Sequence, residues 1–284
     1  MTVPPGRLKT ALANREFPQN RATGAVAMIA VAALATSVGL VLSSGGGTAD
    51  AKSQPSPAPP ARPAVAPARQ AAQLRPAGQP PAVPDSIELA TVHATAPRYA
   101  APGRRTVGTV PASWYERPSV LPVIATRPGW VRVRLAQRPD GSTAWLPASD
   151  VTLSSTPYRI VVDLATTRLA LYDHGRLVFS APAGVGAEDD PTPTGEFFVA
   201  FDEPPPDPNA GYGPFILVTS DHSQAISDWE GSGDAVIGIH GPLGEGGLIG
   251  TTGARISHGC IRLHLQSLER LAQVPPGTPI DVIG

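Results

Sequence analysis

The stretch Ile256–His264, ISHGCIRLH, contains Cys260, the single cysteine of this 284-residue chain. A single cysteine cannot form an intrachain disulfide, so Cys260 is expected to be either a reactive thiol or part of an intermolecular disulfide. The thiolate is the nucleophilic form, and an unperturbed thiol with a pKa near 8.5 is mostly protonated at neutral pH. A neighbouring histidine can take that proton. Two candidates precede Cys260, namely His258 and His240.

His240 is the better candidate for this base. His258 stands only two residues before Cys260, so its side chain need not face the thiol. His240 ends an apolar run, and the sixteen residues GPLGEGGLIGTTGARI separate it from Ser257. Six of these residues are glycine, which suits a loop that turns tightly and returns the chain beside the strand it left. We therefore expect His240 to act as general base and then as general acid.

Apolar runs around this stretch predict a β-rich C-terminal domain over residues 157–284. The runs YRIVVDL, RLALYD, RLVFSAPAGVG, PFILVTS and DAVIGIHG have the composition of strands. Asp173–Gly175, DHG, predicts a hairpin turn. Only Gln266–Val274 is typical of a helix, with Ser267 as its cap and Pro275 ending it.

The order His240, sixteen residues, then Ser-His-Gly-Cys-Ile-Arg-Leu resembles the signature of the L,D-transpeptidase catalytic domain. Asp190–Val199, DPTPTGEFFV, is similar to the threonine-proline-x-glycine segment of that family. The resemblance covers most of residues 157–284. It implies a mainly β catalytic domain with one short C-terminal helix.

The resemblance also implies a reaction and a set of site residues. Cys260 attacks the carbonyl between the third and fourth residues of a peptidoglycan stem peptide, and D-Ala leaves with a proton from His240. The side-chain amine of a neighbouring stem then attacks the thioester and gives a 3→3 cross-link. The backbone N–H groups of Gly259 and Cys260 would stabilise the oxyanion, and the carbonyl of Gly241 would orient the imidazole of His240. The expected roles are oxyanion binding or site shaping for Gly259, His258, Ser257 and Gly241, and loop holding or substrate carboxylate binding for Arg262.

Two other functions stay open at this level. Water could resolve the thioester, which would make the protein an L,D-carboxypeptidase that trims stem tetrapeptides. The chain could also be a non-catalytic wall-binding protein, although the complete His240 and Cys260 motif argues against this. Cysteine enzymes of the papain type are disfavoured because their cysteine precedes their histidine.

The first 42 residues are typical of a membrane segment. Four basic residues between Arg7 and Arg21 precede the uncharged run Gly24–Leu42. Its 19 residues at a rise of 1.5 Å give roughly 28 Å, close to the thickness of a bilayer core. The charge distribution predicts a cytoplasmic tail, 1–23, and a single-pass helix, 24–42, with the catalytic domain outside. The alternative is a signal peptide cleaved near Ala49–Ala51, which would release the protein to the cell wall.

A linker and a second β domain follow the membrane segment. Residues 43–85 are rich in proline and alanine and predict an extended, disordered linker. Residues 86–154 predict a small barrel, because Trp130–Ala136 alternates apolar and basic residues and Arg138–Gly141 is a turn signal. The stretch 128–151 resembles the end of a bacterial SH3-like domain. Of its large aromatic residues we expect most in the core, with ligand binding as the alternative: Trp114, Tyr115, Trp130 and Trp145.

Composition excludes several partners. The net charge is −1 and basic residues cluster only near the N-terminus, so no nucleic acid partner is expected. No cofactor is expected, and the histidine and cysteine spacing predicts no metal site. The remaining histidines are expected on the surface or in loops: His93, His174, His222 and His264. The expected partners are donor and acceptor stem peptides, the cell wall and the membrane.

Overall fold

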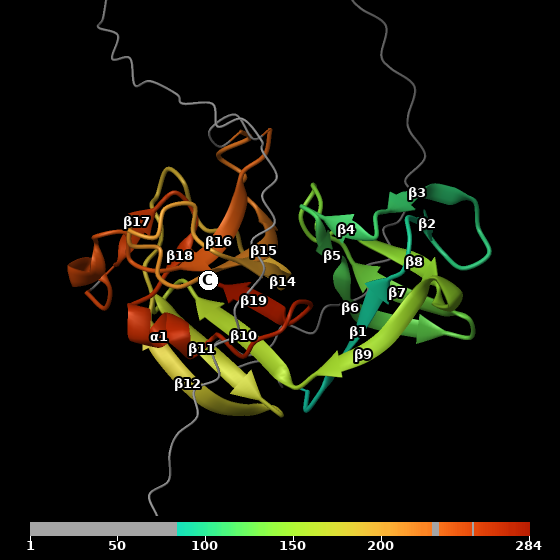
Figure 1. The fold of residues 1–284 in the computed structure, drawn as a ribbon, viewed down its shortest axis with the longest axis horizontal. Coiled ribbons are helices and arrows are strands. Elements are labelled where there is room, and N and C mark those ends of the chain that lie inside the picture. Colours follow the sequence, from blue (N-terminus) through green and yellow to red (C-terminus); the bar gives the residue numbers. More distant parts are fainter. Residues whose placement is uncertain (1–83, 229–232, 252) are drawn as a thin grey trace, which may run out of the picture. The chain divides into compact units, whose positions relative to one another are not determined.

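The computed structural model describes residues 84–228, 233–251 and 253–284. This part of the chain is mainly β with one short α-helix, as expected (Figure 1). The predicted tail, membrane helix and nearly all of the predicted linker lie outside the described residues. Within the described residues, no helix is both long enough and apolar enough to cross a membrane.

The N-terminal part of the described chain forms a seven-stranded sheet in the order β3-β2-β8-β7-β6-β1-β9. Apolar residues alternate with polar ones in β7, which buries Val131 and Val133 and leaves Arg132 exposed. A two-stranded hairpin, β4–β5, stands beside this sheet. The similarity of this region to an SH3-like domain stays a prediction. The strands are β1 (Ile87–Val92), β2 (Ala96–Tyr99), β3 (Thr106–Val110), β4 (Ser113–Trp114), β5 (Arg117–Pro118), β6 (Val120–Arg127), β7 (Trp130–Arg134), β8 (Thr143–Pro147) and β9 (Val151–Thr156), with a 3₁₀ turn, η1, at Ala148–Asp150.

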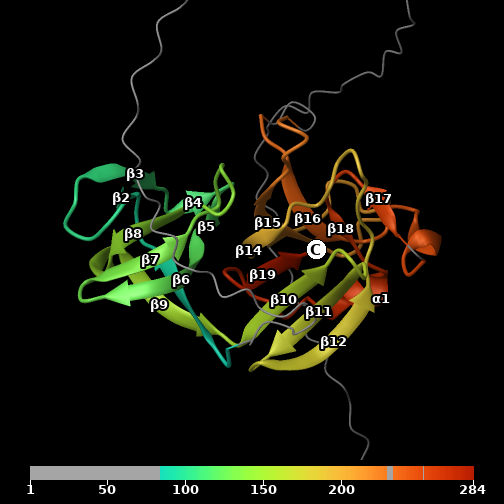
Figure 2. The same cartoon turned by 180° about the vertical axis from the view of Figure 1, so that it is seen from behind.

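The C-terminal part forms an eight-stranded sheet in the order β12-β11-β10-β19-β14-β15-β16-β18. Figures 1 and 2 show β10, β11 and β12 side by side at one end of this sheet. A short parallel pair, β13–β17, lies outside it. The strands are β10 (Tyr158–Asp163), β11 (Arg168–Asp173), β12 (Arg176–Pro182), β13 (Val185–Gly186), β14 (Gly195–Glu203), β15 (Ile216–His222), β16 (Val236–His240), β17 (Arg255–Ser257), β18 (Ile261–Arg262) and β19 (Pro279–Ile283), with a 3₁₀ turn, η2, at Gly246–Leu248.

The predicted turn at Asp173–Gly175 is present. Strands β11 and β12 pair through Asp173 and Arg176, so His174 and Gly175 form a two-residue loop. Both have positive φ, 47° and 70°. This is the backbone twist that suits a tight hairpin between right-handed strands.

The predicted C-terminal helix is shorter and starts earlier than expected. The helix α1 spans Leu265–Glu269, and its N-cap residue is His264, not Ser267. The amide of Ser267 donates to the carbonyl of His264, which places Ser267 inside the first turn. The segment after Glu269 continues as turns rather than as α-helix.

Strand β14 connects two hydrophobic cores. Its residues Phe197 to Phe201 are all buried, and successive side chains of a strand point to opposite faces. Phe197 and Val199 belong to the core of the C-terminal sheet, whereas Phe198 and Ala200 pack with residues of the N-terminal sheet. The two sheets therefore share a core along this strand.

Two leucines in neighbouring strands test this core. Leu169 in β11 has 0% of its surface exposed, whereas Leu177 in β12 is 57% exposed. We expect Leu169→Ala to lower the free energy of unfolding by about 2–5 kcal/mol, because it removes buried methyl groups and leaves a cavity. Leu177→Ala should change it by less than about 0.5 kcal/mol. Urea titrations followed by circular dichroism measure both; equal losses would contradict the assigned core.

Candidate active site

Strands β16 and β18 bring His240 and Cys260 to one face of the sheet. The two strands are parallel, with Ile239 opposite Ile261 and His240 opposite Arg262. Both isoleucines point into the core. Because side chains alternate along a strand, residues next to the isoleucines point to the other face. His240, Cys260 and Arg262 accordingly line one pocket, of about 540 Å³.

The walls of this pocket are mostly apolar. Ionisable and polar groups, including Glu203, Asp234 and His258, stand among apolar and aromatic side chains. An apolar cleft with few convergent polar groups is the usual form of a small-molecule or peptide site. The apolar wall includes Phe201, Tyr212, Ile216, Val218, Ile226, Val236, Ile237 and Leu243.

Cys260 is a half-buried thiol. Burial raises its pKa, while the amide of Gly238 and the charge of Arg262 act in the opposite direction. The Gly238 N–H donates to Sγ at 3.4 Å. The thiol is thus held protonated at neutral pH with a donor directed at the sulfur, and it needs a base to become a nucleophile.

His240 has the properties of that base. Its Nδ1–H donates to the carbonyl oxygen of Gly241 at 2.8 Å, which leaves Nε2 as the acceptor nitrogen of a neutral ring. Burial lowers the pKa of His240 to about 4. The imidazole is therefore neutral at neutral pH. The ring of Tyr212 packs edge-on at 4.9 Å between centroids.

The surroundings of Gly241 leave no room for a side chain. Its amide donates to the Tyr212 carbonyl at 2.6 Å. A Cβ atom at this position would lie 2.5 Å from the carbonyl oxygen of Gly211. This close approach of two backbone segments fixes the carbonyl that orients His240.

The turn before Cys260 is built around Ser257. Its hydroxyl donates to the Cys260 carbonyl at 2.6 Å and accepts from the Gly259 amide at 3.2 Å. Gly259 has φ of 111°, a conformation that favours glycine. The Gly259 amide, which the sequence suggests as an oxyanion donor, is therefore already engaged within the turn.

Thr192 ties this turn to the rest of the domain. Its buried hydroxyl accepts from the Gly186 amide at 2.9 Å and donates to the Gly259 carbonyl at 2.7 Å. Thr192 belongs to the stretch DPTPTGEFFV, which the sequence analysis compares with a family motif. That comparison assigns no role to Thr192 itself. The contact joins residues 67 positions apart, so no local pattern could show it.

His258 and Arg262 contact the segments that surround the pocket. The mostly exposed imidazole of His258 pairs through Nδ1 with Asp190 at 2.6 Å. The guanidinium of Arg262 pairs with Glu245, in the glycine-rich segment after His240. Both residues line the pocket, so each has a structural contact and access to a ligand.

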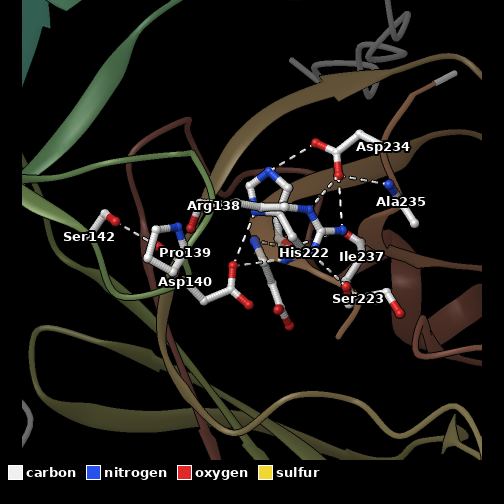
Figure 3. Close-up of polar contacts among 12 residues, drawn as sticks. Arg138, Pro139, Asp140, Ser142, His222, Ser223, Asp234, Ala235 and Ile237 are labelled. Carbon is white, nitrogen blue, oxygen red and sulfur yellow. Dashed lines mark hydrogen bonds and ion pairs between the residues drawn. The ribbon is translucent and has the colours of Figure 1, made fainter. Parts of the chain in front are cut away.

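The expectation that His222 lies on the surface or in a loop is wrong. Strand β15 continues through His222, which is only 2% exposed. Its two ring nitrogens lie 3.1 Å from Asp140 and 3.2 Å from Asp234 (Figure 3). These carboxylates supply the polar partners that a buried imidazole needs, and one of them lies in the N-terminal sheet region.

Asp221 is a buried acid that the sequence analysis did not single out. It is 2% exposed, and neither carboxyl oxygen has a hydrogen-bond partner among the described residues. Burial, followed by the charge of Asp140, raises the pKa of Asp221 to about 9. The group is therefore a neutral acid at neutral pH. Its ionisation would further raise the pKa of Cys260.

Comparisons with known proteins cover the part of the chain that contains His240 and Cys260. Residues 157–282 match the family model described as YkuD, L,D-transpeptidase catalytic domain. The matched segment contains the motif around Cys260 that resembles this family.

Two curated relatives carry the name putative L,D-transpeptidase YkuD. The one from Bacillus licheniformis is 34% identical over 127 residues, which is 44% of this chain and 66% of the relative. The one from Bacillus subtilis is 30% identical over the same shares. The chain thus spans slightly less than two thirds of the length of each relative.

Solved L,D-transpeptidase structures are also similar to the chain. One from Mycobacterium smegmatis is 20% identical, covering 58% of this chain and 90% of that one, with a TM-score of 0.36. The catalytic domain from E. faecium is 24% identical, covering 44% and 96%, with a TM-score of 0.33.

The contacts of Thr192 make a first prediction for the site. Thr192→Val keeps the shape of the side chain but leaves the Gly186 amide and Gly259 carbonyl without this partner. We expect a loss of about 1–3 kcal/mol in the free energy of unfolding. Thr192→Ser retains the hydroxyl and should lose less. Urea unfolding of the two variants measures the difference, and a valine variant as stable as the serine variant would refute the role.

Asp221 makes a prediction about pH. Its pKa is raised from 3.8 to about 9, so the folded state keeps a proton that the unfolded state releases. This contribution to stability is complete below about pH 4 and is lost as pH rises towards 9. Asp221→Asn cannot ionise, so its melting temperature relative to wild type should increase from pH 5 to pH 8.

An exposed acid in the next strand is the control. Asp202→Asn in β14 should show no such growth in the difference between pH 5 and pH 8. Calorimetry at the two pH values gives all three melting temperatures. A pH-independent difference for Asp221→Asn would show that Asp221 is ionised in the folded protein.

Proposed function

We propose that this chain is a peptidoglycan L,D-transpeptidase that forms 3→3 cross-links through a thioester on Cys260. The observation that carries the proposal is that His240, at the end of β16, and Cys260, directly before the adjacent strand β18, line one pocket within the segment that matches this family. The neutral ring of His240 with Nε2 as acceptor fits a general base.

The first half-reaction would run as follows from these groups. Sγ of Cys260 attacks the carbonyl carbon of the third stem residue while Nε2 of His240 takes the thiol proton. The C–N bond to the fourth residue then breaks, and the imidazolium gives the proton to the leaving amine of D-Ala. An imidazole with a pKa of about 4 holds that proton weakly, which favours its transfer to the amine.

The second half-reaction reverses these roles. The side-chain amine of a neighbouring stem attacks the thioester carbonyl, and His240 takes a proton from this amine. The C–S bond breaks, an amide forms, and the thiolate recovers its proton from His240. The apolar walls of the pocket support attack by an amine over attack by water.

The oxyanion of both steps needs backbone donors close to Cys260. The Gly238 amide already points at the sulfur. The Gly259 amide would have to break its hydrogen bond to the Ser257 hydroxyl before it could donate to the oxyanion. We propose that substrate binding makes this exchange, with Gly259 and Cys260 as the donors.

The place of action is part of the proposal and rests on sequence. The uncharged run Gly24–Leu42 after basic residues supports an extracytoplasmic catalytic domain that acts on the cell wall. The donor and the acceptor would both be stem peptides of that wall.

The test incubates the full chain with a disaccharide-tetrapeptide and identifies the products by mass spectrometry. We expect a dimer that lacks one D-Ala. Cys260→Ala should give no detectable dimer, and His240→Ala should lower its rate by at least about 10²-fold. His93→Ala, a change in the N-terminal sheet region, is the matched control and should keep the wild-type rate.

The other outcomes are also informative. Tripeptide without dimer would show an L,D-carboxypeptidase and refute cross-linking. A dimer that persists in Cys260→Ala would refute the nucleophile. The absence of any Cys260-dependent product would exclude this substrate class.

A further inference from the structure

The wall of the catalytic pocket includes one residue from outside the matched domain. Tyr115 lies in the β4–β5 hairpin, between Trp114 and Arg117, and lines the same pocket as Cys260 and His240. It is 54% exposed, so its ring is accessible. The N-terminal sheet region therefore contributes to the site directly.

The backbone at Tyr115 is unusual for this residue type. Tyr115 and Glu116 have φ of 47° and 62°. These are the two central positions of a two-residue hairpin loop, where asparagine and glycine are favoured. A bulky residue at positive φ is an outlier. Local turn preference therefore does not explain the tyrosine, and such outliers concentrate at functional positions.

Aromatic contacts hold the hairpin against the catalytic domain. The Trp114 ring lies 5.8 Å from Phe201 in β14 and 5.9 Å from His222 in β15, between centroids. The Tyr115 ring lies 5.1 Å from Trp114 and 6.2 Å from Phe201. Because Phe201 lines the pocket, these contacts place the tyrosine at its edge.

A second contact holds the pocket segment that follows β15. Arg138 donates to the carbonyls of Ser223 and Ile226 at 2.7 and 3.2 Å and pairs with Asp234 (Figure 3). Ser223, Ile226 and Asp234 all line the pocket. The N-terminal sheet region thus contacts the pocket at two places, the β4–β5 hairpin and the segment after β15. These two contacts fix the position of the Tyr115 ring at the pocket.

We propose that Tyr115 is a substrate-positioning residue whose ring packs against the acyl-donor stem peptide. This inference rests on the proposed function. The peptide whose carbonyl meets Cys260 must occupy the pocket, and Tyr115 lines that same pocket. A tyrosine ring offers an apolar face to the aliphatic parts of a peptide and a hydroxyl for its polar groups. The N-terminal sheet region would then select the donor rather than only space the enzyme.

The test compares substrate kinetics with stability for Tyr115→Asn. Asparagine tolerates positive φ, and this relief offsets the ring contacts that the change removes, so the melting temperature should change little. We expect the KM for donor tetrapeptide, measured by D-Ala release, to rise about tenfold or more, with kcat within about threefold of wild type. Tyr115→Phe should retain most of the affinity. Val107→Asn, also 54% exposed but outside the pocket, should leave KM unchanged.

Alkylation of Cys260 by iodoacetamide distinguishes a wrong role for Tyr115 from a structural defect and from a wrong proposed function. Its rate should be the same in wild type and all three variants, because this small reagent needs no peptide contact. An unchanged KM in Tyr115→Asn, with wild type active, would overturn the role of Tyr115 and leave the proposed function standing. A lower melting temperature with slower alkylation would show a merely structural residue. A wild type that alkylates but releases no D-Ala would refute the proposed function, and this inference with it.

Discussion

The parallel pairing of β16 with β18 is the constraint on which the site depends. Ile239 and Ile261 must both enter the core, and this requirement fixes the register of two strands that are distant in sequence. A shift by one residue would bury the polar side chains and expose the isoleucines. The burial of two ordinary aliphatic residues thereby decides where the thiol and the imidazole emerge.

Polar contacts around the pocket then fix the orientation of the side chains that this register places there. Thr192 holds the turn before the cysteine, and the Gly241 carbonyl fixes the tautomer of His240. Strand β14 is buried on both faces, and its side chains connect the core below the site to the N-terminal sheet. The site is consequently supported by backbone groups, by the core that the two sheets share and by ion pairs at the edge of the pocket, such as Arg262 with Glu245.

Local patterns predicted much of this molecule, because strands and hairpin turns depend on nearby residues. The alternation in β7, the apolar run of β16 and the turn at His174 were all visible in the sequence. The order of His240 and Cys260 indicated the family. Spacing alone could also suggest which strand ends would meet.

The features that the sequence did not show depend on distant partners. The roles of Thr192 and Gly238 arise only when separate segments meet. His222 was expected outside the core because no neighbouring residue indicates its partners, Asp140 and Asp234, which lie 82 and 12 positions away. Tyr115 carries no turn signature, since its conformation is one that its residue type avoids. The helix start was misplaced because Ser267 resembles a cap.

The protonated state of Cys260 has a consequence for chemical durability. Oxidants attack the thiolate far more readily than the thiol, and the products beyond sulfenic acid are not reversed by ordinary reductants. Burial keeps this sulfur in the thiol form until a base removes its proton. A chain with a single cysteine has no second thiol that could reduce an oxidised Cys260. Low reactivity at rest would therefore lengthen the working life of the molecule wherever peroxide is present.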